Sequence, residues 1–200
     1  MSNMDAEMEY QIDRSARVKK ETDPNGLNPK APGAKLDAGK PFVAYVLGGF
    51  SRALTEVAKV GTYGATKYSM DGWSQVTDGP RRYDDAQMRH WLSRKQGEVA
   101  DPDTGLLHAS HEAWNALAKL ELLLREQEKE AALRRLISLL CQDCSELHEH
   151  QIAELVFERE WSVSSRVAPG IAIPHAVIDT VSETRLAIGL SKQGISWEPE

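Results

Sequence analysis

One segment of the sequence, residues 88–120, holds most of the side chains that could bind a metal ion or move a proton. Glu98 and Asp101 are spaced E-x-x-D at the end of a helical pattern. His108 and His111 follow three residues apart, a spacing that places both on one face of a helix. Carboxylates are the ligands that Mg2+ and Mn2+ prefer, and histidines can add ligands or carry protons near neutral pH. The segment therefore predicts a divalent metal site able to hydrolyse a phosphate anhydride without a nucleophilic side chain.

Helices must position these residues. Apolar periodicity predicts helices over residues 46–68, 83–96 and 107–130. A turn over residues 101–105, rich in Asp, Pro and Gly, separates the last two. We expect Leu117, Leu120 and Leu124 to pack a core on the side opposite the histidines. The alternative is that the polar faces of the three helices are simply solvated.

Composition limits the possible classes of protein. The chain has 200 residues, 41% of them apolar, and a net charge of -6. An acidic chain is a poor match for nucleic acid, so we expect no nucleic-acid partner. No apolar run is as long as a membrane span, and the first residues lack the apolar core of a secretion signal. The sequence therefore predicts a cytoplasmic protein with no membrane segment and with reduced cysteines.

The two cysteines belong to a second possible metal set. Cys141 and Cys144, followed by His148 and His150, resemble four zinc ligands. A Cys-x-x-Cys pair inside a leucine-rich helical pattern is more typical of small buried residues, and we favour that interpretation.

The start of the chain is polar and rich in Pro and Gly. Residues 1–33 are predicted to be a mobile arm. Lys35, Asp37 and Lys40 then lie close together between glycines, where backbone and ammonium groups could approach a phosphate. A plain charged loop would look the same.

Several stretches resemble a known family. AKLDAGKP, EVAKVGTYGATKY, RHW and GEVADPDTGLLHASHEAWNAL occur in the order and spacing of the phage and bacterial dATP/dGTP diphosphohydrolases, all-α relatives of the MazG-type nucleotide pyrophosphohydrolases. The resemblance covers residues 35–124. It implies cleavage of a purine (deoxy)nucleoside triphosphate to the monophosphate and pyrophosphate, with Mg2+ or Mn2+. MazG proteins begin their ligand pattern with E-E-x-x-E, whereas Glu56 here is followed by Val57, Ala58 and Lys59.

The resemblance implies roles for individual residues. The expected metal ligands are Glu56, Glu98, Asp101, His108 and His111, with Glu98, Asp101 and His111 as the catalytic residues. The expected substrate-binding residues are Lys35, Asp37, Lys40, Lys67, Arg89 and Asn115. Trp73 or Tyr68 could stack on the base, although either would more often lie in a core.

The sequence changes character after Gln127. Further helices are expected over residues 129–140 and 149–159, and strands over 171–173 and 186–190. His175 follows a short apolar run and a proline, which would hold it in place yet exposed, as suits a residue that accepts and passes on a phosphoryl group. A structural role is commoner for an isolated Pro-His pair.

FEREWSVSSRVAPGIAIPHAVID, followed by RLAIGLSKQGISW, resembles the first half of the fructose/mannitol-type EIIA domain of the sugar phosphotransferase system. The resemblance implies that His175 accepts phosphate from an HPr-like carrier, with Arg159 steadying the phosphoryl group. A phosphohistidine carrier or regulatory protein is thus the alternative function.

Together these features predict a mainly α chain. After the arm, residues 34–127 form a MazG-like helical bundle module and residues 128–200 form a partial α/β EIIA-like module. Three amphipathic helices leave apolar surface uncovered, so we expect a homo-oligomer.

Overall fold

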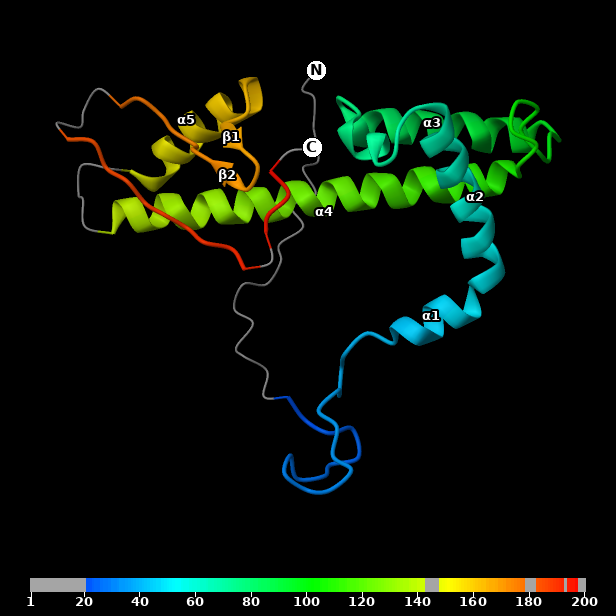
Figure 1. Ribbon diagram of the computed structural model, residues 1–200, viewed down its shortest axis with the longest axis horizontal. Helices are drawn as coiled ribbons and strands as arrows, with labels where there is room; N and C mark the ends of the chain where they lie inside the picture. The colour runs from blue at the N-terminus through cyan, green and yellow to red at the C-terminus, as the bar shows by residue number, and fades with distance from the viewer. Residues whose placement is uncertain (1–20, 143–147, 179–182, 193, 198–200) are drawn as a thin grey trace, which may run out of the picture. The chain divides into compact units, whose positions relative to one another are not determined.

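The computed structural model describes residues 21–142, 148–178, 183–192 and 194–197 (Figure 1). Its elements in chain order are α1 (Val43–Gly49), α2 (Ser51–Lys67), the 3-10 helix η1 (Gly72–Gln75), α3 (Gly79–Lys95), α4 (His108–Cys141), α5 (Glu149–Ser162), β1 (Arg166–Ala168) and β2 (Ile171–Ala172). The predicted class, mainly helical with a small α/β part towards the C-terminus, is confirmed. One compact unit ends at Gly49, and a second begins at Phe50.

In the first unit, the side chain of Asp23 accepts hydrogen bonds from several backbone N–H groups. Asp23 is only 6% exposed, and it accepts hydrogen bonds from the backbone N–H groups of Asn25 and Lys35, both at 2.8 Å. The bond from the Lys35 N–H, together with those from Asn25 and Leu27, outweighs burial and lowers the pKa of Asp23. Residues 21–33 of the predicted arm therefore contain turns held by hydrogen bonds, while residues 1–20 lie outside the described residues.

The single helix predicted over residues 46–68 is wrong, because two helices meet there. α1 ends at Gly49, and Phe50 has non-helical angles, φ -109° and ψ 19°. Adjacent glycines, which are poor helix formers, account for the break. α2 then packs on α4, and its Val57 and Val60 are buried.

α3 and α4 form an antiparallel pair, and Figure 1 shows them side by side. Asp84 binds Lys119 Nζ at 2.6 Å in one part of the pair, and His90 contacts His108 at 2.9 Å nearer the connecting loop. That loop contains the predicted turn, which is confirmed: the Gly105 N–H donates to the Asp101 carbonyl at 2.8 Å. Gly105 has φ +69°, a conformation that glycine adopts without steric cost.

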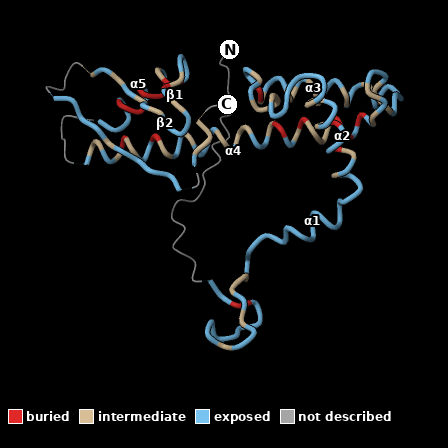
Figure 2. Tube along the Cα trace, viewed as in Figure 1, coloured by how far each residue is buried: buried red, intermediate tan, exposed pale blue. Residues whose placement is uncertain are grey.

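The burial of α4 is the reverse of the prediction. His108, His111 and Asn115 are buried. Leu117, Leu120 and Leu124, here called the leucine stripe, are about half exposed at 49%, 53% and 47%. α3 lies against this face, where its polar side chains meet those of α4: His90 contacts His108, and Arg94 pairs with Glu112. The expectation that the leucine stripe packs a core is therefore wrong, and Figure 2 shows the buried stretches of α4 in red.

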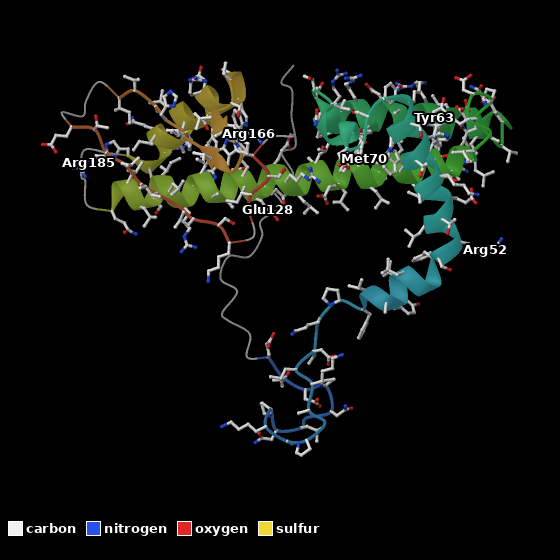
Figure 3. The ribbon with its side chains drawn as sticks, in the orientation of Figure 1. Arg52, Tyr63, Met70, Glu128, Arg166 and Arg185 are labelled. Atoms are coloured by element: carbon white, nitrogen blue, oxygen red, sulfur yellow. The ribbon has the colours of Figure 1, made fainter. Side chains whose placement is uncertain are left out.

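The second half of α4 packs against α5. The two separate helices predicted over residues 107–130 and 129–140 are wrong, because α4 runs unbroken through Glu128 (Figure 3). The core between α4 and α5 consists of Leu133, Ile137, Ile152, Ala153, Val156 and Phe157. The predicted division between residues 127 and 128 thus falls inside one helix, and as a domain boundary it stays a prediction.

A short hairpin follows α5. β1 and β2 are antiparallel, with Arg166 opposite Ala172 and Ala168 opposite Ile171. Gly170, at φ +74°, allows the tight turn between them. The strand predicted over residues 186–190 is wrong, since the described residues of that range are irregular and mostly exposed. Among the described helices, none is both long and apolar enough to cross a membrane.

Candidate metal-binding site

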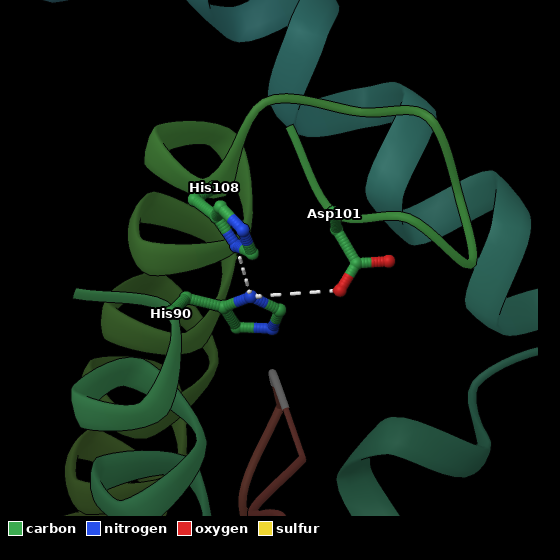
Figure 4. A group of neighbouring side chains, drawn as sticks. All are labelled: His90, Asp101 and His108. Atoms are coloured by element: carbon green, nitrogen blue, oxygen red, sulfur yellow. Dashed lines mark hydrogen bonds and ion pairs between the residues drawn. The ribbon is translucent and has the colours of Figure 1, made fainter. Parts of the chain in front are cut away.

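Three side chains from two helices and their connecting loop converge at one point (Figure 4). His90 projects from α3, Asp101 from the loop and His108 from the first turn of α4. His90 Nδ1 lies 2.9 Å from His108 Nδ1 and 4.0 Å from Asp101 Oδ2. One ligand atom from each residue lies within 4.8 Å of the others. Among the described residues, these form the group of His and acidic side chains that could hold a metal ion.

Glu98 forms a hydrogen bond with His108 through the ring nitrogen that does not face His90. His108 Nε2 lies 3.0 Å from Glu98 Oε2, and His108 itself is 2% exposed. Because a carboxylate only accepts hydrogen bonds, His108 Nε2 must carry the proton. The lone pair of a neutral His108 is therefore on Nδ1, the atom that faces His90.

Asp101 and His111 are linked through Thr104. Asp101 Oδ1 accepts hydrogen bonds from the Thr104 N–H at 3.0 Å, the Thr104 hydroxyl at 3.1 Å and the Asp103 N–H at 3.1 Å. Thr104 Oγ1 also lies 2.9 Å from His111 Nε2. Burial alone would raise the pKa of Asp101, but the hydrogen bonds from Thr104 outweigh it and the pKa is lowered. Asp101 is therefore ionised at neutral pH.

The histidine rings pack on one another. His90 and His111 are stacked, with their centroids 4.3 Å apart and an interplanar angle of 12°. Burial lowers the pKa of His111, and neighbouring His108 lowers it further against the pull of Asp101. Burial and His111 lower the pKa of His90 in the same way. Neutral imidazoles carry the lone pairs that a cation or a proton would need.

The other predicted metal ligand, Glu56, is paired elsewhere. Its carboxylate accepts a hydrogen bond from Lys59 Nζ at 2.6 Å on the exposed side of α2. It is not part of the group formed by His90, Asp101 and His108. Of the five predicted metal ligands, the structure thus brings four together: Glu98, Asp101, His108 and His111.

The predicted substrate-binding residues are dispersed. Lys67 is exposed at the end of α2, with its ammonium 5.7 Å from the ring centroid of Tyr63 and 5.4 Å from that of Tyr68. The phenols of Tyr63 and then Tyr68 raise the pKa of Lys67, and the charge of Asp103 on the site loop contributes to the same shift. Arg89 is exposed on α3.

The other four predicted substrate residues lie in the first compact unit or are engaged within their own helix. Lys35 pairs with Asp37 at 3.0 Å, and Lys40 pairs with Glu21 at 2.8 Å. Asn115 Nδ2 donates to the His111 carbonyl at 2.7 Å, so its amide holds the helix next to His111.

The sequence did not single out His90 as a functional residue. Its partners lie 11 and 18 residues further along the chain, so no local spacing connects them. The one available signal was the RHW stretch within the family resemblance.

His175 forms a separate feature. It is exposed, and Ala176 and Ile178 beside it pack against the α4–α5 core. Its Nδ1 lies 3.0 Å from the Ile173 carbonyl, which can only accept, so Nδ1 carries the proton and Nε2 has the lone pair. Arg159 Nη1 donates to the Val163 carbonyl at 2.8 Å, at the end of α5.

The predicted Cys and His quartet is only partly described. Cys141 is half-buried against the α4–α5 core, and Cys144 lies outside the described residues. His150 is exposed, 3.4 Å from Glu154.

Comparison with known proteins assigns the part of the chain that carries the metal-binding group. The family model for dATP/dGTP diphosphohydrolase, N-terminal, matches residues 30–132, just over half of the chain. The chain belongs to this dATP/dGTP diphosphohydrolase family. All residues of the candidate site lie within the matched range, which supports nucleotide hydrolysis as the activity of this family member. No solved structure matches the chain.

A second family model matches the C-terminal part of the chain. The family model for the phosphoenolpyruvate-dependent sugar phosphotransferase system, EIIA 2, matches residues 117–200. The fructose-specific EIIABC component of the phosphotransferase system of Bacillus subtilis is 31% identical over 80 residues, or 40% of this chain. The chain spans 12% of that relative's length. The two family matches overlap along α4, over residues 117–132.

Proposed function

We propose that the chain hydrolyses purine deoxynucleoside triphosphates, dATP and dGTP, to the monophosphate and pyrophosphate with a divalent cation. The observation that carries the proposal is the convergence of His90, Asp101 and His108 inside the region matched by the family model. Anhydride hydrolysis without a nucleophilic side chain needs a cation beside the phosphates and a group that takes a proton from water. The group supplies the cation ligands, and the neighbouring His111 is a candidate for the proton acceptor.

The donors fit a divalent cation. Asp101 supplies a carboxylate oxygen, and His90 and His108 supply imidazole nitrogens. Of the two expected ions, Mn2+ accepts imidazole ligands more readily than Mg2+, which prefers oxygen and retains its waters. A bound cation would neutralise phosphate charge and lower the pKa of a coordinated water.

His111 is the candidate proton acceptor. It is neutral at pH 7 because burial lowers its pKa. Its Nε2 is connected through the Thr104 hydroxyl to Asp101 Oδ1. Asp101 thus fixes the ring and stabilises the imidazolium that forms when His111 accepts a proton.

Lys67 is our candidate for binding the phosphate chain, because it is exposed. The charge of Asp103, on the site loop, also contributes to the raised pKa of its ammonium. Tyr68, 77% exposed beneath the Lys67 ammonium, is the candidate for stacking on the base. Trp73 is less suited, since it packs edge-on against Trp114 at 6.2 Å. Arg89, Lys35, Asp37 and Lys40 remain proposed substrate contacts.

The test is pyrophosphate release from a panel of deoxynucleoside and ribonucleoside triphosphates, with Mg2+, Mn2+ or chelator. We expect chelator-sensitive release from dATP or dGTP. Asp101→Asn should abolish it while retaining the loop, because the amide oxygen can still accept the Thr104 and Asp103 hydrogen bonds. Asp85→Asn, at an exposed carboxylate of α3 that pairs with Arg81, is the matched control and should retain activity. Equal activity of Asp101→Asn and the control would overturn the proposal.

A second function is favoured by the EIIA 2 match and by the orientation of His175. An exposed Nε2 with a free lone pair can attack a phosphoryl group, and the Ile173 carbonyl would stabilise the resulting charge at Nδ1. We propose transfer from an HPr-like carrier to His175. Incubation with phosphorylated HPr should label the chain, and His175→Ala should remove the label without affecting nucleotide hydrolysis. Labelling that persists in His175→Ala would rule out this assignment.

A further inference from the structure

We infer that His90, His108 and Asp101 form a site for a first-row transition-metal ion in which both histidines bind through Nδ1. Glu98 then orients His108 and does not bind the ion. The inference deepens the proposed function, on which it rests for the role of the ion, but ion binding is measured without nucleotide. It adds His90, which comes from a different helix than the other predicted ligands.

The separation of the two nitrogens fits shared coordination. Two nitrogens about 2.1 Å from one ion and at right angles to each other lie about 3.0 Å apart. The two Nδ1 atoms of His90 and His108 are 2.9 Å apart. Without an ion, this contact is a hydrogen bond in which one imidazole donates to the other. An ion would take the place of that shared proton, and the proton would move to Nε2 of His90.

Glu98 sets the tautomer that binding requires. Its carboxylate accepts a hydrogen bond from the Nε2–H of His108 at 3.0 Å, so the buried His108 offers Nδ1 to the ion. Metal-binding histidines commonly donate their other ring N–H to a carboxylate in this way. A carboxylate bound to Nε2 lies on the side of the ring opposite Nδ1. Glu98 is therefore a positioning residue.

The two carboxylate oxygens of Asp101 have different partners. Oδ1 accepts three hydrogen bonds from the loop, two from Thr104 and one from Asp103. Oδ2 is the oxygen that approaches His90 Nδ1, at 4.0 Å. The loop therefore fixes the carboxylate through one oxygen and presents the other as a charged ligand. His111, stacked on His90 at 4.3 Å, fixes the plane of that ring.

The ligand set determines the class of ion. Two imidazoles and one carboxylate suit Mn2+, Fe2+, Co2+ or Zn2+, whereas Mg2+ selects oxygen ligands. We therefore expect Mn2+ to bind the isolated chain more tightly than Mg2+.

The experiment is Mn2+ binding to the full chain without nucleotide, followed by electron paramagnetic resonance with pulsed detection of 14N couplings. Wild-type chain should bind Mn2+ with imidazole 14N couplings, and tenfold more Mg2+ should not displace it. His90→Gln should weaken binding at least tenfold and reduce the couplings. His150→Gln, in an exposed histidine of α5, is the matched control and should change neither. Glu98→Gln should weaken binding about 10- to 100-fold while 14N couplings persist at saturating Mn2+.

Circular dichroism of each metal-free variant separates loss of a ligand from loss of the fold. The side chain of Glu98 is 43% exposed, so the fold should tolerate Glu98→Gln. Absence of binding, bound Mn2+ without 14N couplings, or unchanged affinity in a folded His90→Gln variant would each overturn the inference. Mn2+ binding as expected but with no nucleotide hydrolysed would leave the site intact and refute the proposed function. Unchanged Mn2+ affinity of His90→Gln together with full nucleotide hydrolysis would refute the site and leave the function intact.

Discussion

A buried carboxylate in the α4–α5 region gives the sharpest prediction about stability. Glu160 is 4% exposed. Its Oε1 lies 2.8 Å from Lys129 Nζ and 2.7 Å from Trp197 Nε1, and its Oε2 accepts the Ser165 N–H at 3.2 Å. Glu160→Ala would leave a largely buried ammonium and two N–H donors without their acceptor. Breaking a buried pair in this way costs about 3–5 kcal/mol of unfolding free energy.

Glu160→Gln separates the charge from the hydrogen bonds. The single amide oxygen can still accept from Trp197 or from Ser165, so the charge-assisted bond to Lys129, at about 1.5–3 kcal/mol, and the acceptor of one of these two N–H groups are lost. Urea unfolding, followed by circular dichroism and tryptophan fluorescence, measures both variants at pH 7. We expect stability to decrease in the order wild type, Glu160→Gln, Glu160→Ala.

The same carboxylate predicts a pH dependence. Burial raises the pKa of Glu160, but the hydrogen bonds from Lys129 and Ser165 outweigh it, so the pKa lies below its usual value of 4.5. A lowered pKa in the folded state means that the contribution is complete above pH 4.5 and is lost as the pH falls through the folded value. Wild type should therefore lose more stability than Glu160→Gln below pH 4.5. An unfolding free energy of Glu160→Ala within about 0.5 kcal/mol of wild type, a change typical of exposed sites, would refute this reasoning.

Two further predictions concern packing. Gly61→Ala would place Cβ 2.6 Å from Trp114 Cη2, and overpacking of about 1–3 kcal/mol should exceed the helix-propensity gain of about 1 kcal/mol. Gly64→Ala, in the same helix with nothing within 4 Å of its Cβ, should instead stabilise the protein by about 0.5–1 kcal/mol. Thermal unfolding measures both variants, and a higher melting temperature for Gly61→Ala than for Gly64→Ala would contradict this account. The exposed leucine stripe predicts an oligomer in sedimentation velocity that Leu120→Glu dissociates and that Leu139→Glu, on the other half of α4, leaves intact. A monomeric wild type would rule out self-association through the stripe.

The sequence predicted most of the helices, since their periodic patterns are local. It also predicted that His108 and His111 share one face of α4, and that a turn precedes them. The break at Phe50 was missed because apolar residues continue across it, and the strand at 186–190 was wrong because an apolar run alone does not provide a pairing partner.

What the sequence alone determined was therefore which residues lie on the same face and which segment carries the acidic and histidine side chains. Helical spacing decides this within one element. Only the tertiary structure decided which face of α4 is buried, because burial depends on what α3 presents. The same packing joined His90 to His108, 18 residues away, and left Glu56 paired with Lys59. Contacts between helices depend on how the helices dock, and no spacing within a single helix encodes that.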